Sequence, residues 1–420
     1  MATRYVVRGG HRLSGTVRVA GMTKNAGLKQ MAASLLAQGT TVLRNVTPVV
    51  DLDIMIDLLR GIGATVEWAE PEVLQITVGD ALEPEAPYEL VSQMRASINV
   101  LGPLLARLGH ARVAMPGGDN IGSRKLDMHF AALEAMGAEL EVLHGFVEAR
   151  CNALCGARVV LEFPSVGATE TVLTTAVLAK GQTVIENAAR EPEINDLCEF
   201  LTSMGARISG AGSSTIEIEG VDELHTVDRA IVGDRIEAGT LLMACGAAGG
   251  SIAVEGIDVK HVEMVVRKLN EMGMTIETTP DGLVARADEP LQAVDVQTLP
   301  YPGFSTDFMP LAVALLTRAE GTAIVTENIF DNRFAFVDEL NRMGADIRTE
   351  GRHAVVRGVE RLTGAPVRAH DVRAGAALVL AALGADGETT VHDPRHVDRG
   401  YSNLPGKLAS LGADVSRVEE

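Results

Sequence analysis

The feature that most constrains this chain of 420 residues is an internal repeat with a period of about 70 residues. In each copy an amphipathic segment, with apolar residues three and four positions apart, ends at a glycine and leads into a predicted strand. This spacing predicts a helix that the glycine terminates, because glycine adopts the left-handed conformation at little cost. The six copies are residues 58–66, 133–140, 201–208, 269–276, 340–347 and 408–415, with Gly63, Gly137, Gly205, Gly273, Gly344 and Gly412.

A second element repeats with the same period. Segments rich in Ala and Leu lead through Gly39, Gly109, Gly181, Gly250, Gly321 and Gly387 into further predicted strands. Such segments, for example residues 31–36, 311–316 and 376–383, are apolar on nearly all sides, which is typical of helices inside a protein. Each copy is predicted to run strand, buried helix, strand, amphipathic helix and strand pair. Six copies that close in threes would form two similar lobes, with the sheets outside and the apolar helices inside.

Composition and charge narrow the class of protein. Hydrophobic residues make up 46% and charged residues 22% of the chain, as in globular proteins. No apolar run approaches the roughly 20 residues of a membrane span, and the first residues read as a strand rather than a signal peptide. We therefore expect a cytoplasmic protein whose four cysteines are free thiols, with Cys198 and Cys245 in the core. The net charge of −19 argues against nucleic acid as a partner, and any anionic substrate needs a local cluster of basic residues.

The stretch 116–129 is rich in glycine and carries a distinctive charge pattern. Its glycines leave the backbone able to turn and to approach a ligand closely. Asp119 lies between them, and Arg124 and Lys125 follow. The pattern is typical of a lid that closes over an anion, and a surface turn with scattered charges is the other interpretation.

Several motifs occur in the same order as in the enolpyruvyl transferases, which essentially the whole chain resembles. They lie at residues 95–97, 116–129, 165–169, 186–193, 233–239, 306–307, 331–334, 371–376 and 398–401. The resemblance implies a two-lobed inside-out α/β barrel built from six repeats of about 70 residues. The first lobe would hold residues 1–21 and 233–420, and the second would hold residues 22–232 with the mobile loop 116–129. The cleft between the lobes would bind the substrates.

Within the family, the match looks closest to the branch that acts on UDP-N-acetylglucosamine. The resemblance implies transfer of the enolpyruvyl (carboxyvinyl) group of phosphoenolpyruvate to the 3-hydroxyl of UDP-N-acetylglucosamine, with release of phosphate. This reaction is the first committed step of peptidoglycan synthesis. Neither a metal nor an organic cofactor is implied, and the sequence contains no metal-ligand cluster or nucleotide P-loop. Nucleic acid and membrane are not expected partners.

By the resemblance, two acids carry the chemistry. Asp307 would receive the proton of the sugar 3-hydroxyl, although its position also fits an acid that caps a helix. Asp119 stands where most members have a cysteine and some have aspartate, and it would donate a proton to C3 of phosphoenolpyruvate. A lone aspartate is mostly ionised at neutral pH; a dianionic phosphate in a closed site favours its protonated form, and Arg124 opposes this. Because fosfomycin alkylates the cysteine thiolate in the family, we expect this chain to be insensitive to it.

Cations at separate places in the sequence match family positions that bind the substrates. Lys24, Arg124 and Arg399 would hold phosphoenolpyruvate and would also stabilise the reaction intermediate. Asn25 and Arg95 would contact the sugar nucleotide. Guanidinium groups bind phosphate and carboxylate oxygens through paired hydrogen bonds. Taken singly, each of these cations also fits an exposed surface charge.

The resemblance further implies a pocket for the nucleotide and the sugar. Its members are Arg124, Lys125, Leu126, Asp127 and Met128, then Phe163, Pro164, Ser165, Val166 and Gly167, together with Ile329 and Arg373. The family often has lysine where Phe163 stands. The stretch at Ser165 precedes an apolar helix predicted near residues 169–178, so its hydroxyl and backbone N–H groups are expected to meet a diphosphate.

Other functions stay open. A related transferase that acts on another acceptor, such as UMP, is favoured by Met22-Thr23, where the family has a single alanine, and by Asn99, where it often has an aromatic residue. Shikimate 3-phosphate is a weaker candidate, because the sugar-nucleotide segments match. A non-catalytic scaffold that only binds a nucleotide sugar is disfavoured by the presence of both acids. His129 and His396 fit either an assisting role at the cleft or a structural one.

Overall fold

The computed structural model describes residues 3–21, 24–119, 121–123 and 125–419. The chain forms two compact units. Unit 1 holds Met1–Ala20, Asp119–Ser123 and Gly233–Glu420, and unit 2 holds Gly21–Gly118 and Arg124–Val232. Each unit has its own hydrophobic core, and the two cores share no residue. The short segment Asp119–Ser123 belongs to unit 1 although its neighbours in the chain belong to unit 2.

One sheet pattern recurs in both units. Each four-stranded sheet begins with a parallel edge pair and continues with two antiparallel pairs. In the described part of unit 1, these sheets are β23 (Pro366–Arg368), β25 (Glu388–His392), β1 (Thr3–Arg8) and β26 (Asp414–Glu419); β2 (Leu13–Arg18), β15 (Gly250–Glu255), β17 (Gly282–Ala287) and β16 (Thr275–Thr279); and β18 (Val296–Gln297), β19 (Thr322–Thr326), β21 (His353–Arg357) and β20 (Asp346–Glu350). A two-stranded sheet pairs β22 (Leu362–Thr363) with β24 (Ala385–Asp386).

Unit 2 repeats the pattern. Its described sheets are β14 (Asp228–Ala230), β3 (Gly39–Arg44), β5 (Val73–Val78) and β4 (Thr65–Glu70); β6 (Glu85–Ala86), β7 (His110–Ala114), β9 (Phe146–Arg150) and β8 (Glu139–Leu143); and β10 (Arg158–Val160), β11 (Gln182–Glu186), β13 (Thr215–Glu219) and β12 (Arg207–Ser209). Strand β14, at the end of unit 2 in sequence, pairs with β3 near its start. Strand β2 pairs with β15, although the residues of unit 2 separate these two strands in the sequence. These two pairings complete one sheet in each unit.

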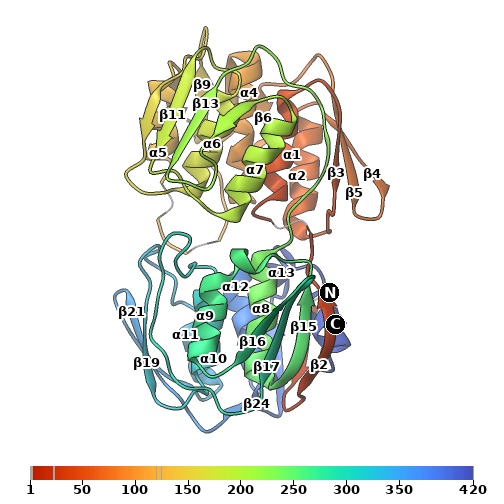
Figure 1. Ribbon diagram of the computed structural model, residues 1–420, viewed down its shortest axis with the longest axis vertical. Coiled ribbons are helices and arrows are strands. Elements are labelled where there is room, and N and C mark those ends of the chain that lie inside the picture. Colours follow the sequence, from red (N-terminus) through yellow and green to blue (C-terminus); the bar gives the residue numbers. More distant parts are fainter. Residues whose placement is uncertain (1–2, 22–23, 120, 124, 420) are drawn as a thin grey trace. The chain divides into compact units, whose positions relative to one another are not determined.

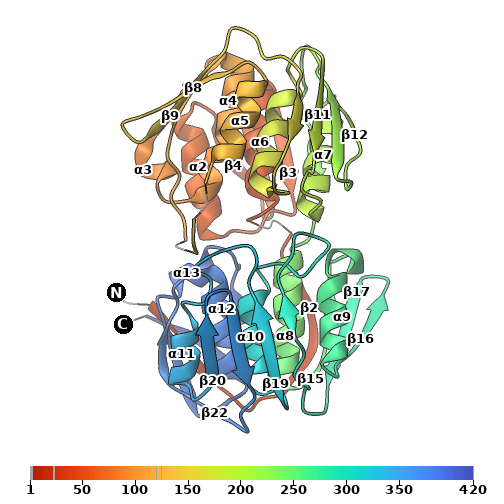
Figure 2. The ribbon, with the colours of Figure 1, turned by 90° about the vertical axis from the view of Figure 1, so that its left-hand side faces the viewer.

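The apolar helices lie inside the units. In unit 1, α8 (Arg235–Ala248), α10 (Met309–Leu316) and α12 (Val372–Leu383) pack side by side with the sheets around them (Figures 1 and 2). All residues of α10 and α12 are buried. In unit 2 the corresponding helices are α1 (Gly27–Ala33), α4 (Leu101–Leu108) and α6 (Val166–Ala176). The helix predicted at residues 31–36 is α-helical only to Ala33 and ends as the 3₁₀ turn η1 (Ser34–Leu36), and α4 follows the 3₁₀ segment η2 (Arg95–Val100).

The amphipathic helices and their glycine stops are confirmed. These helices are α2 (Val50–Gly61), α5 (Asp127–Ala135), α7 (Pro192–Ser203), α9 (Glu263–Glu271), α11 (Val337–Arg342) and α14 (Leu404–Ser410). The glycine after each has φ between 94° and 105°. At Gly273 an added Cβ would meet nothing within 4 Å, so the backbone conformation alone favours glycine there. The predicted order of strand, buried helix, strand, amphipathic helix and strand pair is therefore correct, for example in β10, α6, β11, α7, β12 and β13.

The remaining short helices are α3 (Tyr88–Val91), η3 (Val259–His261) and α13 (Arg395–Asp398). The cysteines are free thiols, and Cys198 in α7 and Cys245 in α8 are buried, as predicted. Burial raises the pKa of Cys198 to about 12, so that thiol is inert at neutral pH. In the part of the chain that the structure describes, no helix has both the length and the apolar character that crossing a bilayer requires.

Candidate active site

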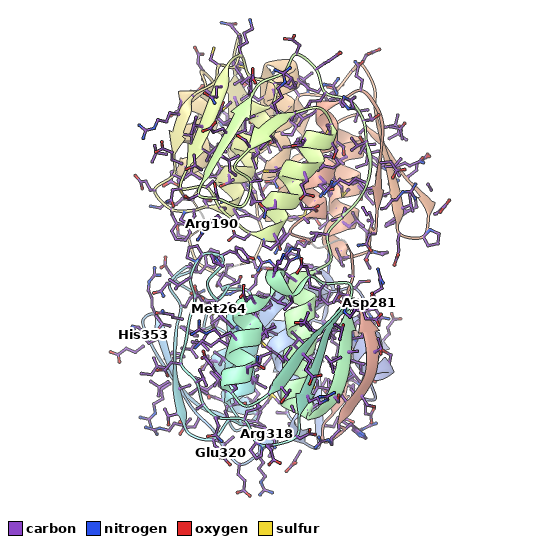
Figure 3. The ribbon with its side chains drawn as sticks, in the orientation of Figure 1. Arg190, Met264, Asp281, Arg318, Glu320 and His353 are labelled. Atoms are coloured by element: carbon purple, nitrogen blue, oxygen red, sulfur yellow. The ribbon has the colours of Figure 1, made fainter. Side chains whose placement is uncertain are left out.

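Candidate residues of unit 1 gather at the N-terminal ends of its buried helices. Asp307 lies two residues before α10, and the Asp371 carboxylate caps α12 by accepting hydrogen bonds from the backbone N–H groups of Arg373 (2.8 Å) and Ala374 (3.0 Å). Asp234 caps α8 in the same way. The loop after α10, which carries Arg318 and Glu320, lies at the other end of these helices (Figure 3). Helix N-termini bear partial positive charge, so this end of unit 1 favours anions.

Asp307 lies between two buried guanidinium groups. Its Oδ1 is 3.4 Å from Nη2 of Arg333, and its Oδ2 is 3.5 Å from Nη2 of Arg373. Arg333 also lies 3.6 Å from Asp371, so acids and arginines alternate along one network. The Asp307 side chain keeps 27% of its exposure, whereas the two arginine side chains keep 2% and 6%. The Asp307 carboxylate is therefore accessible, while the two guanidinium groups beside it are buried.

The structure tests one of the two interpretations of Asp307, that of an acid capping α10. The N-terminus of α10 has no side-chain cap, so the interpretation of Asp307 as a capping acid is wrong. Arg333 was missed as a candidate, because it follows Asp331 and Asn332 in a loop without periodicity. The one signal for it in the sequence is its place in the family motif at residues 331–334.

Arg373 remains charged in its buried position. Burial by itself lowers the pKa of Arg373, but the negative charge of Asp307 and its contacts with Tyr401 and Asp234 outweigh this and raise it. The guanidinium lies 5.2 Å from the centre of the Tyr401 ring, and the tyrosine hydroxyl bonds Thr240 (2.8 Å). Burial raises the pKa of Asp234 to about 7, although the nearby Arg373 opposes the rise. Asp234 therefore titrates near neutral pH.

Asp119 contacts Arg399 in unit 1. Nη1 of Arg399 donates a hydrogen bond of 2.7 Å to Oδ1 of Asp119, and the two side chains keep only 11–12% of their exposure. Nδ1 of the half-exposed His396 lies 4.0 Å from the same oxygen. Ile121 contacts the loop before Arg333, because the Asn332 N–H donates to the carbonyl of Ile121 (3.2 Å). Two of the predicted residues, Asp119 and Arg399, are thus brought together.

Lys24 in unit 2 is paired with a buried acid. Its Nζ lies 2.8 Å from Oδ2 of Asp51, and Asp51 lies in the first turn of α2. The side chain of Asp51 is fully buried. Asn25 follows it and is half-buried, just before α1. Arg95 begins η2 and donates to the backbone carbonyl of Lys125 (3.3 Å). Lys24, Asn25 and Arg95 therefore lie at the starts of helical segments, as the candidates of unit 1 do.

The predicted nucleotide stretch is partly helical. Helix α6 begins at Val166, earlier than expected, so Val166 and Gly167 belong to the helix. The Ser165 hydroxyl caps it by accepting a hydrogen bond from the backbone N–H of Ala168 (3.3 Å). Pro164 is half-buried, and Phe163 keeps 39% of its exposure. Ser165 thus already fills a structural role, in addition to the phosphate contact expected from the sequence.

The base of the glycine-rich stretch leads into α5, which begins at Asp127. Lys125 and Asp127 are exposed, Leu126 is buried and Met128 is half-buried. Arg124, Met22 and Thr23, which figured in the sequence predictions, lie outside the described residues. Ile329 follows β19 in unit 1 and is half-buried.

Two polar residues of unit 2 turn out to be interior. His129 is buried and bonds the Thr171 hydroxyl through Nδ1 (2.8 Å), which fits the structural role. Burial, together with Arg95, lowers the pKa of His129 to about 4, so it is neutral near pH 7. Asn99 donates to Oε2 of the buried Glu170 (3.1 Å), and Lys29 lies 3.4 Å from the same carboxylate. The unusual Asn99 thus belongs to an interior polar network.

Comparisons with known proteins agree with this architecture. The family model for EPSP synthase (3-phosphoshikimate 1-carboxyvinyltransferase) matches residues 7–408. The UDP-N-acetylglucosamine 1-carboxyvinyltransferases of Corynebacterium jeikeium and Mycobacterium tuberculosis are 53% and 51% identical to this chain, over 100% of both partners in each comparison. UDP-N-acetylglucosamine 1-carboxyvinyltransferase 1 of Caldanaerobacter subterraneus is 48% identical, over 99% of this chain and 100% of the relative.

This chain belongs to the UDP-N-acetylglucosamine 1-carboxyvinyltransferase family. It is therefore a transferase. Solved structures give the same fold for this family member: the enolpyruvyl transferase NikO from Streptomyces tendae superposes with a TM-score of 0.89 at 25% identity, over 99% of both chains. An EPSP synthase from Acinetobacter baumannii gives 0.75 at 18% identity over 100% of both chains. The predicted inside-out α/β architecture of six repeats is thus confirmed for this UDP-N-acetylglucosamine 1-carboxyvinyltransferase relative.

Proposed function

We propose that this chain transfers the enolpyruvyl group of phosphoenolpyruvate to the 3-hydroxyl of UDP-N-acetylglucosamine and releases phosphate, the first committed step of peptidoglycan synthesis. The observation that carries the proposal is the identity of about half of all residues, over the full length, to transferases named for this reaction. The two acids expected for the chemistry, Asp119 and Asp307, each contact arginine. We assign the reaction to the cytoplasm, which the free thiols support.

Asp307 is the proposed general base. Two guanidinium groups within 3.5 Å hold its carboxylate, and its partial exposure lets a hydroxyl reach it. In the first step the 3-hydroxyl oxygen bonds C2 of phosphoenolpyruvate, and its proton passes to Asp307. Ile329 is proposed to line the pocket for the sugar, and Arg373, with Asp371, to hold the local network.

Asp119 is the proposed general acid, in the place where most of the family has a cysteine. It donates a proton to C3 of phosphoenolpyruvate as C2 is attacked, which gives a tetrahedral intermediate. Elimination then removes a proton from C3 and breaks the bond between C2 and the phosphate oxygen. In the absence of substrate, Arg399 holds the Asp119 carboxylate at 2.7 Å. A phosphate that binds Arg399 would compete with Asp119 for that guanidinium.

The remaining cations are assigned to the anionic groups of the substrates. Lys24, Arg124 and Arg399 are proposed to hold phosphoenolpyruvate and to stabilise the intermediate. Asn25 and Arg95, with residues 124–128 and 163–167, are proposed to contact the sugar nucleotide. The pairing of Lys24 with the buried Asp51 supports this, because it fixes the ammonium group at the start of α1.

The choice of acceptor is tested by phosphate release from phosphoenolpyruvate with UDP-N-acetylglucosamine, UMP or shikimate 3-phosphate. We expect rapid release with UDP-N-acetylglucosamine only. Release with UMP alone would replace the proposal by the related transferase, and release with none of them would favour a binding scaffold. The pairing of Asn99 with Glu170 inside unit 2 removes one of the two features that favoured another acceptor.

Fosfomycin tests the assignment of the acid. A carboxylate at position 119 offers no thiolate to alkylate, so turnover is expected to survive fosfomycin. Asp119→Cys is expected to become sensitive in a time-dependent way. Rapid inactivation of the unaltered enzyme would contradict the assignment.

A further inference from the structure

A buried carboxylate outside the proposed chemistry joins two loops of unit 1. Glu327 follows β19 and is only 1% exposed. Among the described residues, its Oε1 accepts hydrogen bonds from the Thr298 hydroxyl (3.0 Å) and from the backbone N–H groups of Ile329 (2.7 Å) and Phe330 (3.0 Å). Its Oε2 accepts one from the Thr306 hydroxyl (2.9 Å). A carboxylate with this many donors is held in one orientation.

The two loops that Glu327 joins carry proposed contacts of the acceptor sugar. Thr306 is the residue before Asp307, so its bond fixes the backbone from which the proposed base extends. The bonds from Ile329 and Phe330 fix the loop that continues to Arg333, whose guanidinium lies 3.4 Å from Asp307. One side chain thus sets the spacing between the base and the loop opposite it.

The surroundings keep Glu327 in place. Its backbone N–H donates to the carbonyl of Arg352 (2.8 Å), and Nη1 of Arg352 donates to the carbonyl of Asn328 (2.8 Å). Thr326, the residue before Glu327, pairs on the sheet with His353, and Oγ1 of Thr326 lies 3.0 Å from Nδ1 of His353. Because the base of the loop is tied to strand β21, movement of Glu327 relative to the sheet is restricted.

We propose that Glu327 is a positioning residue that sets the geometry between Asp307 and the acceptor sugar, acting through Thr306 and the loop at Ile329. The inference rests on the proposed function, because it assigns Glu327 to the same reaction. Displacing a catalytic group by about 1 Å can lower the rate about 100-fold. The hydrogen bonds of Glu327 are therefore expected to affect kcat and the KM for the acceptor, and to affect the KM for phosphoenolpyruvate much less.

The test removes one link at a time. Thr306→Val keeps the shape of the side chain and deletes the hydroxyl, and we expect kcat/KM for UDP-N-acetylglucosamine to fall at least tenfold, with KM for phosphoenolpyruvate within twofold. Thr306→Ser restores the hydroxyl and is expected to recover activity to within threefold. Thr317→Val is the control: this hydroxyl is buried and donates to a helix carbonyl, that of Ala314 (2.6 Å), and its loss should leave the kinetics unchanged.

A double-mutant cycle distinguishes positioning through Thr306 from a general destabilisation of unit 1. Glu327→Ala and Thr306→Val break the same link, so the double variant should lose little more acceptor kcat/KM than Glu327→Ala alone. If Glu327→Ala fails to fold, the threonine series decides. Thr306→Val with normal acceptor kinetics would overturn the inference. So would KM values for both substrates that rise by the same factor and that Thr306→Ser does not restore. Absent turnover by the unaltered enzyme in the same assay would instead overturn the proposed function.

Discussion

The two units share one architecture but place different charges at the starts of their buried helices. In unit 1, acids and arginines alternate, and Asp307 keeps 27% of its side-chain exposure between two guanidinium groups. In the described part of unit 2, two buried acids lie beside lysines: Asp51 is 2.8 Å from Lys24 and Glu170 is 3.4 Å from Lys29. Burial raises the pKa of Glu170, although the charge of Lys29 opposes this.

This difference indicates how one repeat can serve two tasks. The unit 1 network leaves a carboxylate accessible beside fixed positive charge, which suits proton transfer next to an anionic substrate. In the two pairs of unit 2, the acid holds the lysine in place, which suits the binding of an anionic substrate. We therefore expect changes to the unit 1 acids to affect turnover, and changes to the unit 2 pairs to affect stability and affinity.

The largest expected effect is on turnover, in Asp119→Asn. A general acid contributes about 10²–10⁴-fold to a rate, and the amide cannot donate the proton. We expect kcat to fall by about that factor, while UDP-N-acetylglucosamine still binds by isothermal titration calorimetry. Near-normal turnover of the variant would remove Asp119 from the mechanism, and loss of sugar-nucleotide binding would assign it a different role.

A smaller effect, on stability and affinity, is expected when the Asp51–Lys24 pair of unit 2 is broken. Removing one partner of a buried pair costs about 3–5 kcal/mol, and the exposure of Lys24 (19%) places this pair at or below the lower limit. Asp51→Asn should therefore lower the free energy of unfolding and raise KM for phosphoenolpyruvate. The double variant Lys24→Met/Asp51→Asn should recover stability without recovering that affinity. A variant with unchanged stability and KM would show that the pair holds nothing in place.

The smallest expected effects are opposite trends with pH. His129 in unit 2 has its pKa lowered to about 4 by burial, so between pH 6.5 and 4 the unfolded chain binds more protons and stability falls as pH falls, by at most about 1.4 kcal/mol per pH unit. Asp234 in unit 1 has its pKa raised to about 7 by burial, so the folded chain binds more protons above pH 4, and stability falls as pH rises to 7.

Neutral variants isolate each trend. Melting temperatures measured from pH 4 to 7 should fall less steeply toward acid for His129→Gln than for the unaltered chain. The melting temperature of Asp234→Asn should fall less steeply toward neutral pH than that of the unaltered chain, because the amide needs no proton. Curves parallel to that of the unaltered chain would show that neither burial shifts the proton balance.

Sequence periodicity predicted the repeats, the buried helices and the glycine stops, because these depend on contacts within each copy. The helix before Gly39 is the exception, since its last turn is 3₁₀ rather than α. The charge networks could not be predicted in this way. Asp307, Arg333 and Arg373 come from three different segments, and only the folded helices bring them together.

Residues with two possible roles also exceeded what the sequence could decide. Ser165 was expected to meet a phosphate, yet its hydroxyl caps α6. His129 fitted both a functional and a structural role until its burial was known. Glu327 gave no signal, because a single acid after a short apolar strand resembles an ordinary surface charge until its hydrogen-bond donors are seen.

The most direct test of the account is the isotopic composition of the product formed in D₂O. If Asp119 protonates C3 before phosphate leaves, that carbon becomes a methyl group, and the transferred vinyl group carries deuterium in the mass spectrum of the sugar-nucleotide product. We predict labelled product from the unaltered enzyme and almost no turnover with Asp119→Asn. Product without deuterium at C3 would contradict protonation by Asp119.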